Sequence, residues 1–457
     1  MEKGGHLIIV VGAGPAGMQV ANALSKDGHT VILLNRDAKF GGLAEYGIFP
    51  SKHRLRNGLR KSYWDILHRE NVYYFGNLTV GNGKHISIQD LQQIGASALV
   101  IATGAQGTKS VGVQGENALG VYHAKDVVYH YNQLPGFSQR PFETGQRVAV
   151  IGIGDVMVDI AHWLIRYRKV KEVTAIVRRG PAERKYNPKE SHAICSNIDR
   201  EYLEKEFARI HSRLQAAGQA PDQILKDMVG EFAKCDSPVS DTRMRFRVLS
   251  SPGRVLVDQS NRVRALEIEE NKLERRGEDY ASVGLKLFHE FHCDSVIFAV
   301  GDQVDQNLGL PTRNGNFATN PHPTQNEPDD AIFQVYDEGS GKVLEGFFTV
   351  GWARKASAGL VGIAKRDGDR CSEVVRRYLA TKSQLDASTL QDKVKKLHFL
   401  LETRQPEVVN KTDLEILYQL ECEEVKLRGL EEFKFSTNEE MIAAIQERRR
   451  SIATAKV

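Results

Sequence analysis

The glycine-rich turn near the N-terminus constrains the fold more than any other feature. Residues 7–11 (LIIVV) form a short apolar run, which leads directly into Gly-x-Gly-x-x-Gly at 12–17. Residues 18–26 keep helical spacing, and a second apolar run follows at 30–34. A buried strand, a glycine turn, a helix and another strand in this order predict a dinucleotide-binding βαβ unit in a parallel sheet.

Each position of this turn has a physical role. Gly12 allows the tight turn, Gly14 lets a pyrophosphate approach the backbone, and Gly17 lets the helix pack against the strand. Pro15 and Ala16 stand in the first helical turn, whose free N–H groups face the phosphates.

The end of the second strand departs from the usual pattern. An acid at this place normally binds the ribose hydroxyls, but here Asn35 stands there. An amide still accepts from a hydroxyl without the charge-assisted bond. The neighbouring Arg36 offers a contact to a phosphate, and the alternative is that both are ordinary turn residues.

A second copy of the pattern begins with the apolar run at 148–151. Gly152 and Gly154 form its turn, and Asp155 opens the following helix. Met157 stands where the third small residue belongs, which argues against tight packing of this helix on its strand.

The next strand, at 173–177, ends in Arg178 and Arg179 rather than in an acid. Two arginines suit the 2′-phosphate of NADP(H), which an unphosphorylated ribose lacks. The alternative is a solvent-exposed basic turn.

Strand-like runs at 98–104 and 294–301 stand where the chain passes between the two nucleotide domains, and 346–362 returns to a strand and a glycine-rich turn. We therefore predict an α/β protein with two Rossmann-like, three-layer nucleotide-binding domains. The expected boundaries are 1–105 and 335–382 for the discontinuous first domain, 106–334 for the second, and 383–457 for a helical C-terminal extension.

This extension has polar-faced helices, and we expect a solvated helical appendix. Thr412 with Glu415 and Thr437 with Glu440 have the spacing of capping boxes.

Composition narrows the class of protein. A chain of 457 residues exceeds what one hydrophobic core supports. No apolar run has the length of a membrane span, and residues 1–5 are too short and polar for a signal peptide, so we expect a cytoplasmic protein. The five cysteines form no Cys-x-x-Cys pair, so we expect no redox disulfide, iron–sulfur cluster or metal site.

Two nucleotide sites without a reactive cysteine pair indicate hydride exchange between a nicotinamide and a flavin, because the cofactors carry that chemistry. The residues also resemble a known family. VVGAGPAGM and the segments 39–50, 151–159, 177–181 and 351–362 are similar, in order, to motifs of adrenodoxin reductase and bacterial ferredoxin reductases. The resemblance runs along nearly the whole chain. It implies an FAD protein that passes electrons from NADPH to small iron–sulfur proteins.

For FAD, the resemblance implies that Gly12, Gly14 and Gly17 hold the pyrophosphate and that Asn35 takes the place of the ribose acid. It also implies contacts in three later segments: Gly42 and Leu43 in the loop passing the FAD, Gly351 and Trp352 before the flavin ring, and Gly359 and Leu360 at the pyrimidine edge.

For NADPH, the resemblance implies Gly152, Gly154 and Asp155 at the phosphates, Arg178 and Arg179 at the 2′-phosphate, and Glu190 at the nicotinamide amide. Two departures stand out. Ala193 replaces the family's second glutamate, and Lys52, followed by His53, replaces its histidine. Glu190 and His53 are the expected catalytic residues, although a proton relay between a histidine and a glutamate is not expected.

A basic stretch lies close to the expected flavin loop. The ten residues 52–61 contain no acid and carry Lys52, Arg54, Arg56, Arg60 and Lys61. Basic faces steer acidic partners such as ferredoxins, whereas the alternative is an ordinary charged surface. We expect a ferredoxin-like acidic iron–sulfur partner, no nucleic acid, no membrane span, and a monomer or weak homodimer.

The leading hypothesis is an FAD-dependent NADPH:ferredoxin oxidoreductase. One alternative is a flavoprotein subunit of a larger redox complex, like the small subunit of glutamate synthase, although the cysteine-rich segment of such subunits is absent. Another is an NADPH dehydrogenase of a small organic acceptor, which needs a base near the flavin. A third is a degenerate nucleotide-binding protein.

Overall fold

The computed structural model describes residues 4–323, 329–357, 359 and 361–454. The chain forms two compact units: unit 1 contains Met1–Lys109, Tyr129–Arg140 and Gly301–Val457, and unit 2 contains Ser110–Val128 and Pro141–Val300. Unit 1 is therefore discontinuous. Its return segment begins at Gly301, directly after the last strand of the unit 2 sheet, whereas the boundary expected from the sequence lay at 335.

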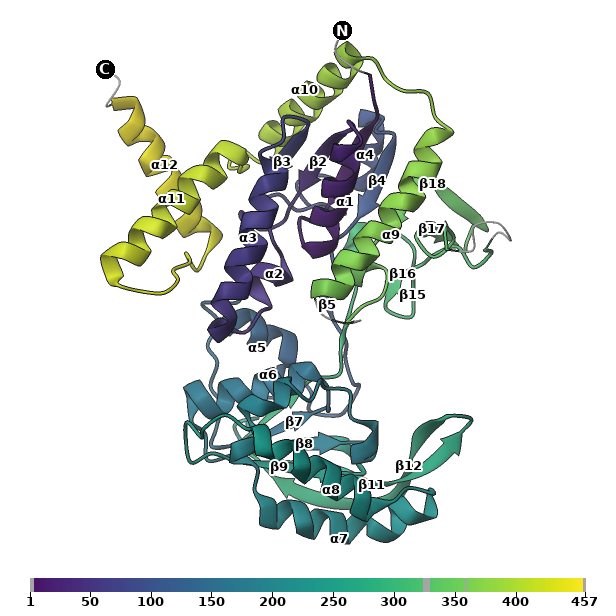
Figure 1. Ribbon diagram of the computed structural model, residues 1–457, viewed down its shortest axis with the longest axis vertical. Helices are drawn as coiled ribbons and strands as arrows, with labels where there is room; N and C mark the ends of the chain where they lie inside the picture. The colour runs from purple at the N-terminus through teal and green to yellow at the C-terminus, as the bar shows by residue number, and fades with distance from the viewer. Residues whose placement is uncertain (1–3, 324–328, 358, 360, 455–457) are drawn as a thin grey trace. The chain divides into compact units, whose positions relative to one another are not determined.

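Unit 1 is built on a six-stranded sheet with the order β17-β18-β4-β1-β2-β3 (Figure 1). All neighbours pair in parallel except β17 and β18, which are antiparallel. This arrangement confirms the predicted α/β class with parallel strands. The strands are β1 (Leu7–Val11), β2 (Thr30–Leu34), β3 (Val72–Phe75), β4 (Ala98–Ile101), β17 (Gln334–Asp337) and β18 (Lys342–Thr349).

Helices cover both faces of this sheet, because successive side chains of a strand point to opposite sides. Ile8 and Val10 of β1 point to one face of the sheet, where they pack in one hydrophobic core with a first group of helices. Leu7 and Ile9 point to the opposite face, where they pack in a second core with a second group of helices. The first group is α1 (Pro15–Lys26), α3 (His53–Leu67), α9 (Val361–Ala380), α11 (Lys411–Arg428) and α12 (Asn438–Thr454), and the second is α4 (Ile88–Ile94) and α10 (Ala387–Arg404).

The C-terminal extension is part of these cores. Leu397 and Leu401 of α10 are fully buried in one core, and Leu417 of α11 and Met441 of α12 are buried in the other. The expectation of a solvated appendix is therefore wrong. Polar residues dominate these helices, but a narrow apolar stripe on each is enough to bury it against the sheet layers.

Of the two capping boxes predicted in the C-terminal extension, the structure contains one. The box at Thr437 is present, because the Glu440 N–H donates to Thr437 Oγ1 at 3.1 Å. The box expected at Thr412 is wrong. Asn410 and Asp413 form it instead, and α11 begins at Lys411.

Unit 2 holds a five-stranded sheet of order β6-β13-β7-β8-β9, entirely parallel. A three-stranded antiparallel sheet, β10-β11-β12, accompanies it. The strands are β6 (Val121–His123), β7 (Arg147–Ile151), β8 (Glu172–Val177), β9 (Arg243–Val248), β10 (Ser250–Val257), β11 (Val263–Arg276), β12 (Asp279–His292) and β13 (Ser295–Phe298), and the helices are α6 (Asp155–Trp163), α7 (Arg200–Ala216) and α8 (Pro221–Glu231).

Short elements complete the chain: α2 (Leu43–Tyr46), α5 (Ala124–Tyr131), β5 (Gly107–Thr108), β14 (Asp302–Gln303), β15 (Thr312–Arg313) and β16 (Asn316–Phe317). Over the described residues, none of the helices combines the length and the apolar character needed to span a bilayer.

The burial of α10 leads to a test of the tail as part of the fold. Leu397 is 0% exposed, whereas Phe399 on the same helix is 75% exposed. We expect Leu397→Ala to lower the free energy of unfolding by about 2 to 5 kcal/mol and Phe399→Ala to change it by less than about 0.5 kcal/mol. Urea unfolding followed by circular dichroism measures both. Equal small effects would show that α10 is not needed by the core.

Candidate functional site

The first glycine turn joins β1 to α1 under tight steric limits. Gly12 has a φ of +110°, and its N–H donates to the carbonyl of Leu34 at 2.7 Å. A Cβ at Gly12 would lie 2.4 Å from the carbonyl oxygen of Ala102, and one at Gly17 would lie 2.0 Å from the carbonyl oxygen of Gly12. Both positions therefore require glycine.

Gly14 differs from its two neighbours in the motif, because a Cβ there would meet no described atom within 4 Å. It precedes α1, which has Pro15 in its first turn and no side chain capping its N-terminus. Free N–H groups beside open space form an anion-binding site. The turn made by Gly12, Gly14, Pro15, Ala16 and Gly17 therefore fits a pyrophosphate.

Asn35 braces this turn from the end of β2. It is buried, its Oδ1 accepts the N–H of Ala13 at 3.1 Å, and its Nδ2 donates to the carbonyls of Asp37 and Lys39 at 2.8 and 2.7 Å. Its amide N–H groups thus bind acceptors inside the protein. The sequence did not predict this structural role.

Arg36 is also engaged. Its Nε and Nη2 donate to the carboxylate of Asp37 at 3.0 and 3.1 Å, and its Nη1 donates to Gln106 Oε1 at 2.9 Å. Asp37 raises the pKa of the guanidinium above its ordinary value. The structure therefore gives Arg36 an acid partner, and the contact to a phosphate considered from the sequence stays a prediction.

Two distant loops meet the start of α1. The N–H of Gly41 donates to the carbonyl of Ala13 at 2.8 Å, and a Cβ at Gly42 would lie 3.1 Å from the Cα of Gly14. A Cβ at Gly351 would lie 2.8 Å from the Cβ of Ala16. Residues expected around an FAD from three parts of the sequence thus converge on one turn.

The remaining members of that group are less closely described. Leu43 opens α2 directly after Gly42, and Trp352 follows Gly351 in a short 3-10 helix. Gly359 has a φ of +76°. Leu360 lies outside the described residues.

Sequence reasoning missed Asp367, a buried acid within α9. Its Oδ2 accepts the N–H of Gly351 at 2.7 Å, and it forms an ion pair with Arg354. Asp367 thereby holds the turn that precedes Trp352. The only signal available was an acid inside the helix that follows the glycine-rich return segment.

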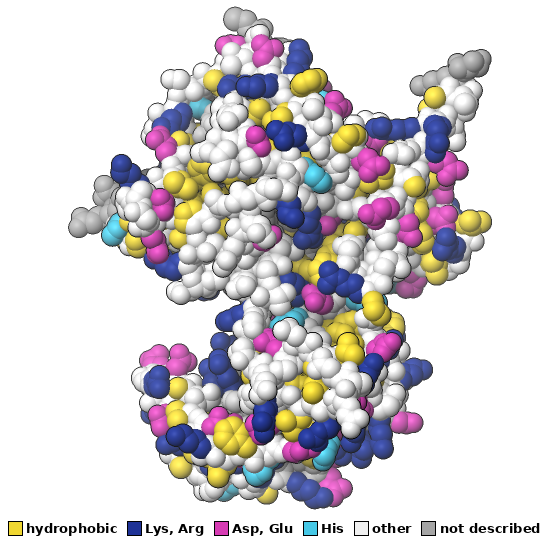
Figure 2. Space-filling model, turned by 180° about the vertical axis from the view of Figure 1, so that it is seen from behind, with side chains coloured by type: hydrophobic (Ala, Val, Ile, Leu, Met, Phe, Trp, Pro, Cys, Tyr) yellow, Lys and Arg dark blue, Asp and Glu magenta, His cyan; other side chains and the backbone are white. Residues whose placement is uncertain are grey.

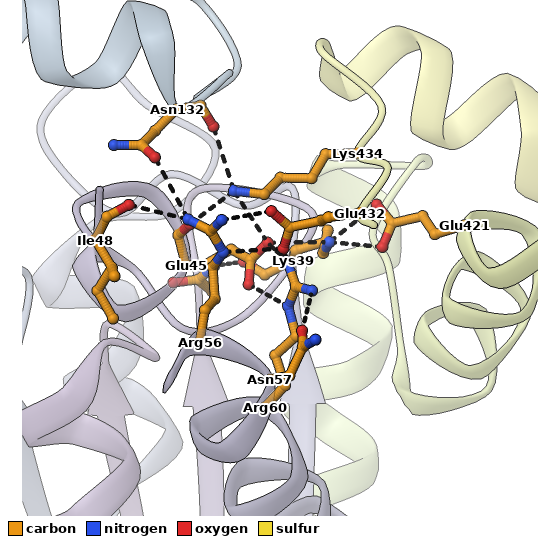
Figure 3. Close-up of polar contacts among 11 residues, drawn as sticks. Lys39, Glu45, Ile48, Arg56, Asn57, Arg60, Asn132, Glu421, Glu432 and Lys434 are labelled. Carbon is orange, nitrogen blue, oxygen red and sulfur yellow. Dashed lines mark hydrogen bonds and ion pairs between the residues drawn. The ribbon is translucent and has the colours of Figure 1, made fainter. Parts of the chain in front are cut away.

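The loop carrying Gly42 is attached to a buried charge cluster (Figure 3). The Glu45 carboxylate accepts from Lys39 at 3.3 Å and from the Nε of Arg60 at 2.6 Å. Burial opposes its charge, but the surrounding cations hold the pKa of Glu45 well below its ordinary value. We use the name buried charge cluster for Lys39, Glu45, Arg56, Arg60, Glu421, Glu432 and Lys434.

This cluster removes two of the five cations from the docking face expected at 52–61, whereas Lys52, Arg54 and Lys61 are exposed, so a face made of these three stays a prediction. The side chain of Arg56 is 1% exposed and pairs with Glu432, and Arg60 pairs with Glu45 and Glu432. These guanidiniums are internal because acids far along the chain fold back onto them. On the face drawn in Figure 2, Lys and Arg side chains are interspersed with Asp and Glu.

His53 begins α3, and its Nδ1 lies 3.5 Å from Glu431 Oε2. The structure therefore gives this expected catalytic residue a carboxylate neighbour in the C-terminal extension.

The second glycine turn repeats the geometry of the first within unit 2. Gly152 has a φ of +138°, and a Cβ there would lie 2.6 Å from the carbonyl oxygen of Ala299. A Cβ at Gly154 would meet no described atom within 4 Å. Met157 is fully buried in α6, so its larger side chain is accommodated in the core without breaking the helix.

A following loop is pinned to this turn. The N–H of Lys185 donates to the carbonyl of Ile153 at 3.1 Å, and the N–H of Asn187 donates to Asp155 Oδ1 at 2.7 Å. Asp155 therefore holds the loop with its side chain. Glu190 opens a 3-10 helix in contact with α6.

Arg178 is exposed and Arg179 half-buried at the end of β8. Arg179 lines a cavity of about 540 Å³ together with Lys185, Arg184 and Tyr280. Arg184 is neutralised by Glu231 at 2.6 Å, whereas Arg179 has no ion pair with any residue that the structure describes. This corner of unit 2 therefore offers the cationic donors of Arg179 and Lys185, although Glu183, Glu278 and Asp279 line the same cavity.

Cys195 and Cys235 form a disulfide across 40 residues of sequence. The expectation from the sequence concerned only a redox pair of the Cys-x-x-Cys type and did not include this disulfide. The spacing of the cysteines in the sequence does not indicate this pair, because only the fold of unit 2 brings the two residues together.

Comparisons with known proteins agree with this geometry. The family model described as "Pyridine nucleotide-disulphide oxidoreductase" matches residues 6–205. The mitochondrial NADPH:adrenodoxin oxidoreductase of Salvelinus fontinalis is 24% identical, over 92% of this chain and 87% of that protein. The NADPH-ferredoxin reductase FprA of Mycobacterium leprae is also 24% identical, over 88% and 90%.

The fold matches a solved structure from end to end. FprA of Mycobacterium tuberculosis in complex with NADPH superposes with a TM-score of 0.78 at 22% identity, and the match covers 97% of this chain and 100% of that one. The motifs, the two glycine turns and the similarity over nearly the full length lead to one conclusion: the chain is similar in sequence and in fold to the adrenodoxin-reductase-type pyridine nucleotide oxidoreductases.

Proposed function

We propose that this protein is an FAD-dependent oxidoreductase that takes a hydride from NADPH and passes single electrons to a ferredoxin-like iron–sulfur protein. The observation that carries the proposal is the pair of glycine turns, each with open space at its middle glycine. The relatives named NADPH:adrenodoxin oxidoreductase and NADPH-ferredoxin reductase support the reaction.

The first turn is the proposed FAD site. The N–H groups at the start of α1 would bind the pyrophosphate, and the loops at Gly42 and Gly351 would enclose the rest of the molecule. A bound flavin would accept a hydride and release electrons one at a time. The fit rests on the open position at Gly14, because among the three glycines of the first motif a Cβ would meet no described atom only there.

The second turn is the proposed NADPH site. The N–H groups beside Gly154 would bind the pyrophosphate, while Arg178 and Arg179 would bind the 2′-phosphate. Glu190 would bind the nicotinamide amide from its helix beside α6. No side-chain base is required, because a hydride rather than a proton is transferred, and His53 is therefore proposed as a positioning group only.

Purification and reduction test the proposal. We expect a yellow protein whose flavin, released by denaturation, is FAD, and whose absorbance bleaches with NADPH under anaerobic conditions. Ferredoxin should then be reduced faster than quinones or small organic acceptors. Gly14→Ala is expected to fold, because its Cβ meets no described atom, but to lose FAD. Protein that binds no flavin, or only FMN, would contradict the proposal.

The preference for NADPH over NADH is expected to depend on Arg178 and Arg179. Hydrogen bonds to charged groups contribute about 1.5 to 3 kcal/mol each, so two partly solvated ones predict a preference of about 10 to 100-fold. Changing both to alanine should remove most of this ratio of kcat/KM values. Arg166→Ala is the control, because Arg166 is exposed elsewhere in unit 2. A double variant with the full preference would show that other residues read the 2′-phosphate.

A further inference from the structure

Lys434 is a buried cation that the proposed reaction does not use. It lies in the segment between α11 and α12, and its side chain is 5% exposed. Its Nζ donates to the carbonyl oxygen of Glu45 at 2.8 Å and to that of Asn132 at 3.4 Å, and it lies 3.6 Å from Glu45 Oε1 (Figure 3). Burial lowers the pKa of Lys434 to about 8. A buried lysine is stable only when such partners offset its desolvation.

The main acceptor of Lys434 is the end of a very short helix. Glu45 is the third residue of α2, which contains only Leu43–Tyr46. The last carbonyls of a helix lack partners within it, so a lysine bound to one of them acts as a C-terminal cap. Lys434 supplies this cap from 389 positions further along the chain.

The other end of α2 meets the first glycine turn. Gly42 immediately precedes α2, and a Cβ at Gly42 would lie only 3.1 Å from the Cα of Gly14. The N–H of Gly41 is bonded to the carbonyl of Ala13. Only Leu43 and Ala44 therefore lie between Gly42 and the capped residue Glu45, so we expect a displacement of the cap to reach the turn.

Further contacts attach the same tail to the same loop. Lys39, which precedes Gly41, donates to Glu421 of α11 at 2.7 and 2.9 Å. Arg56 pairs with Glu432. The segment from Glu421 to Lys434 thus holds the loop before α2, the end of α2 and α3 at once.

We propose that Lys434 is a positioning residue for the flavin: by capping α2 it keeps the loop at Gly42 against the first glycine turn, so that retention of FAD depends on the C-terminal extension. This inference rests on the proposed function, because it takes the first turn as the FAD site. It assigns the extension to that site, although no residue of the extension belongs to the glycine motifs.

The experiment compares the rate of FAD release from wild-type holoprotein and from Lys434→Met, measured as the rise in flavin fluorescence after dilution well below the melting temperature. Methionine keeps most of the volume and removes the charge and the donors. We expect release about tenfold faster in Lys434→Met, because one charge-assisted hydrogen bond is lost. Lys434→Arg should restore a rate near the wild-type value. Lys426→Met is the matched control, since Lys426 is an exposed lysine of the same tail.

Two further measurements separate positioning from general stability. The affinity for NADP⁺ reports on unit 2 and should change little. The melting temperature of the apoprotein is expected to fall, because Glu45 loses a buried cationic partner. Leu397→Ala, which lowers stability from the other core of unit 1, is therefore the stability control and should not speed FAD release. If Lys434→Met does not fold, Lys434→Leu, which also lacks a donor to the Glu45 carbonyl, replaces it and should also speed FAD release.

The outcomes are distinct. Release at the wild-type rate from Lys434→Met, or from Lys434→Leu where the first variant does not fold, would overturn the inference. So would acceleration equal to that of Lys426→Met. Wild-type protein that binds no FAD would instead overturn the proposed function.

Discussion

The backbone contact between Gly12 and Gly17 determines how the rest of unit 1 is arranged. No side chain separates the start of α1 from the turn, since a Cβ at Gly17 would lie 2.0 Å from the carbonyl oxygen of Gly12. The helix therefore starts directly at the carboxyl edge of the parallel sheet and leaves Gly14 facing open space. The loops at Gly42 and Gly351 then pack on this helix start, the first against the backbone of Gly14 and the second against the Cβ of Ala16.

Buried ion pairs connect this arrangement to the C-terminal extension. Residues of the buried charge cluster come from the loop before α2, from α2 and α3, and from the segment around α11. Burial raises the pKa of Glu421 even though Lys39 lies beside it, which shows how far this cluster is removed from water. Buried charges tolerate no missing partner, so the loop and the extension depend on each other.

Unit 2 reaches the same turn geometry by a different route. Gly152 approaches the carbonyl of Ala299 as Gly12 approaches that of Ala102. The third small residue is replaced by Met157, whose side chain is buried in the core. Backbone donors from Lys185 and Asn187 then tie a loop across the turn. The requirement that both units share is the glycine at the turn itself, Gly12 or Gly152, because in both units a Cβ there would meet a backbone carbonyl oxygen.

The sequence alone determined the local parts of this protein: the apolar runs that become β1 and β7, the glycine turns, the helices after them, and the arginine pair that ends β8. These follow from the strand and helix spacings and from steric limits within a few residues, which any window of sequence displays. The positions of Gly12, Gly14, Gly152 and Gly154 were therefore predictable.

Only the tertiary structure decided which polar groups are partners. From the sequence, Arg56 and Arg60 are expected to be surface cations, but the fold places Glu432 and Glu45 against them. The fold also brings Cys195 within bonding distance of Cys235, which lies 40 residues away in the sequence. The side-chain amide of Asn35 likewise donates hydrogen bonds to the carbonyls of Asp37 and Lys39 in the loop that follows β2. The physical reason is that ion pairs, disulfides and buried hydrogen bonds depend on distance in space, whereas local spacing records only neighbours along the chain.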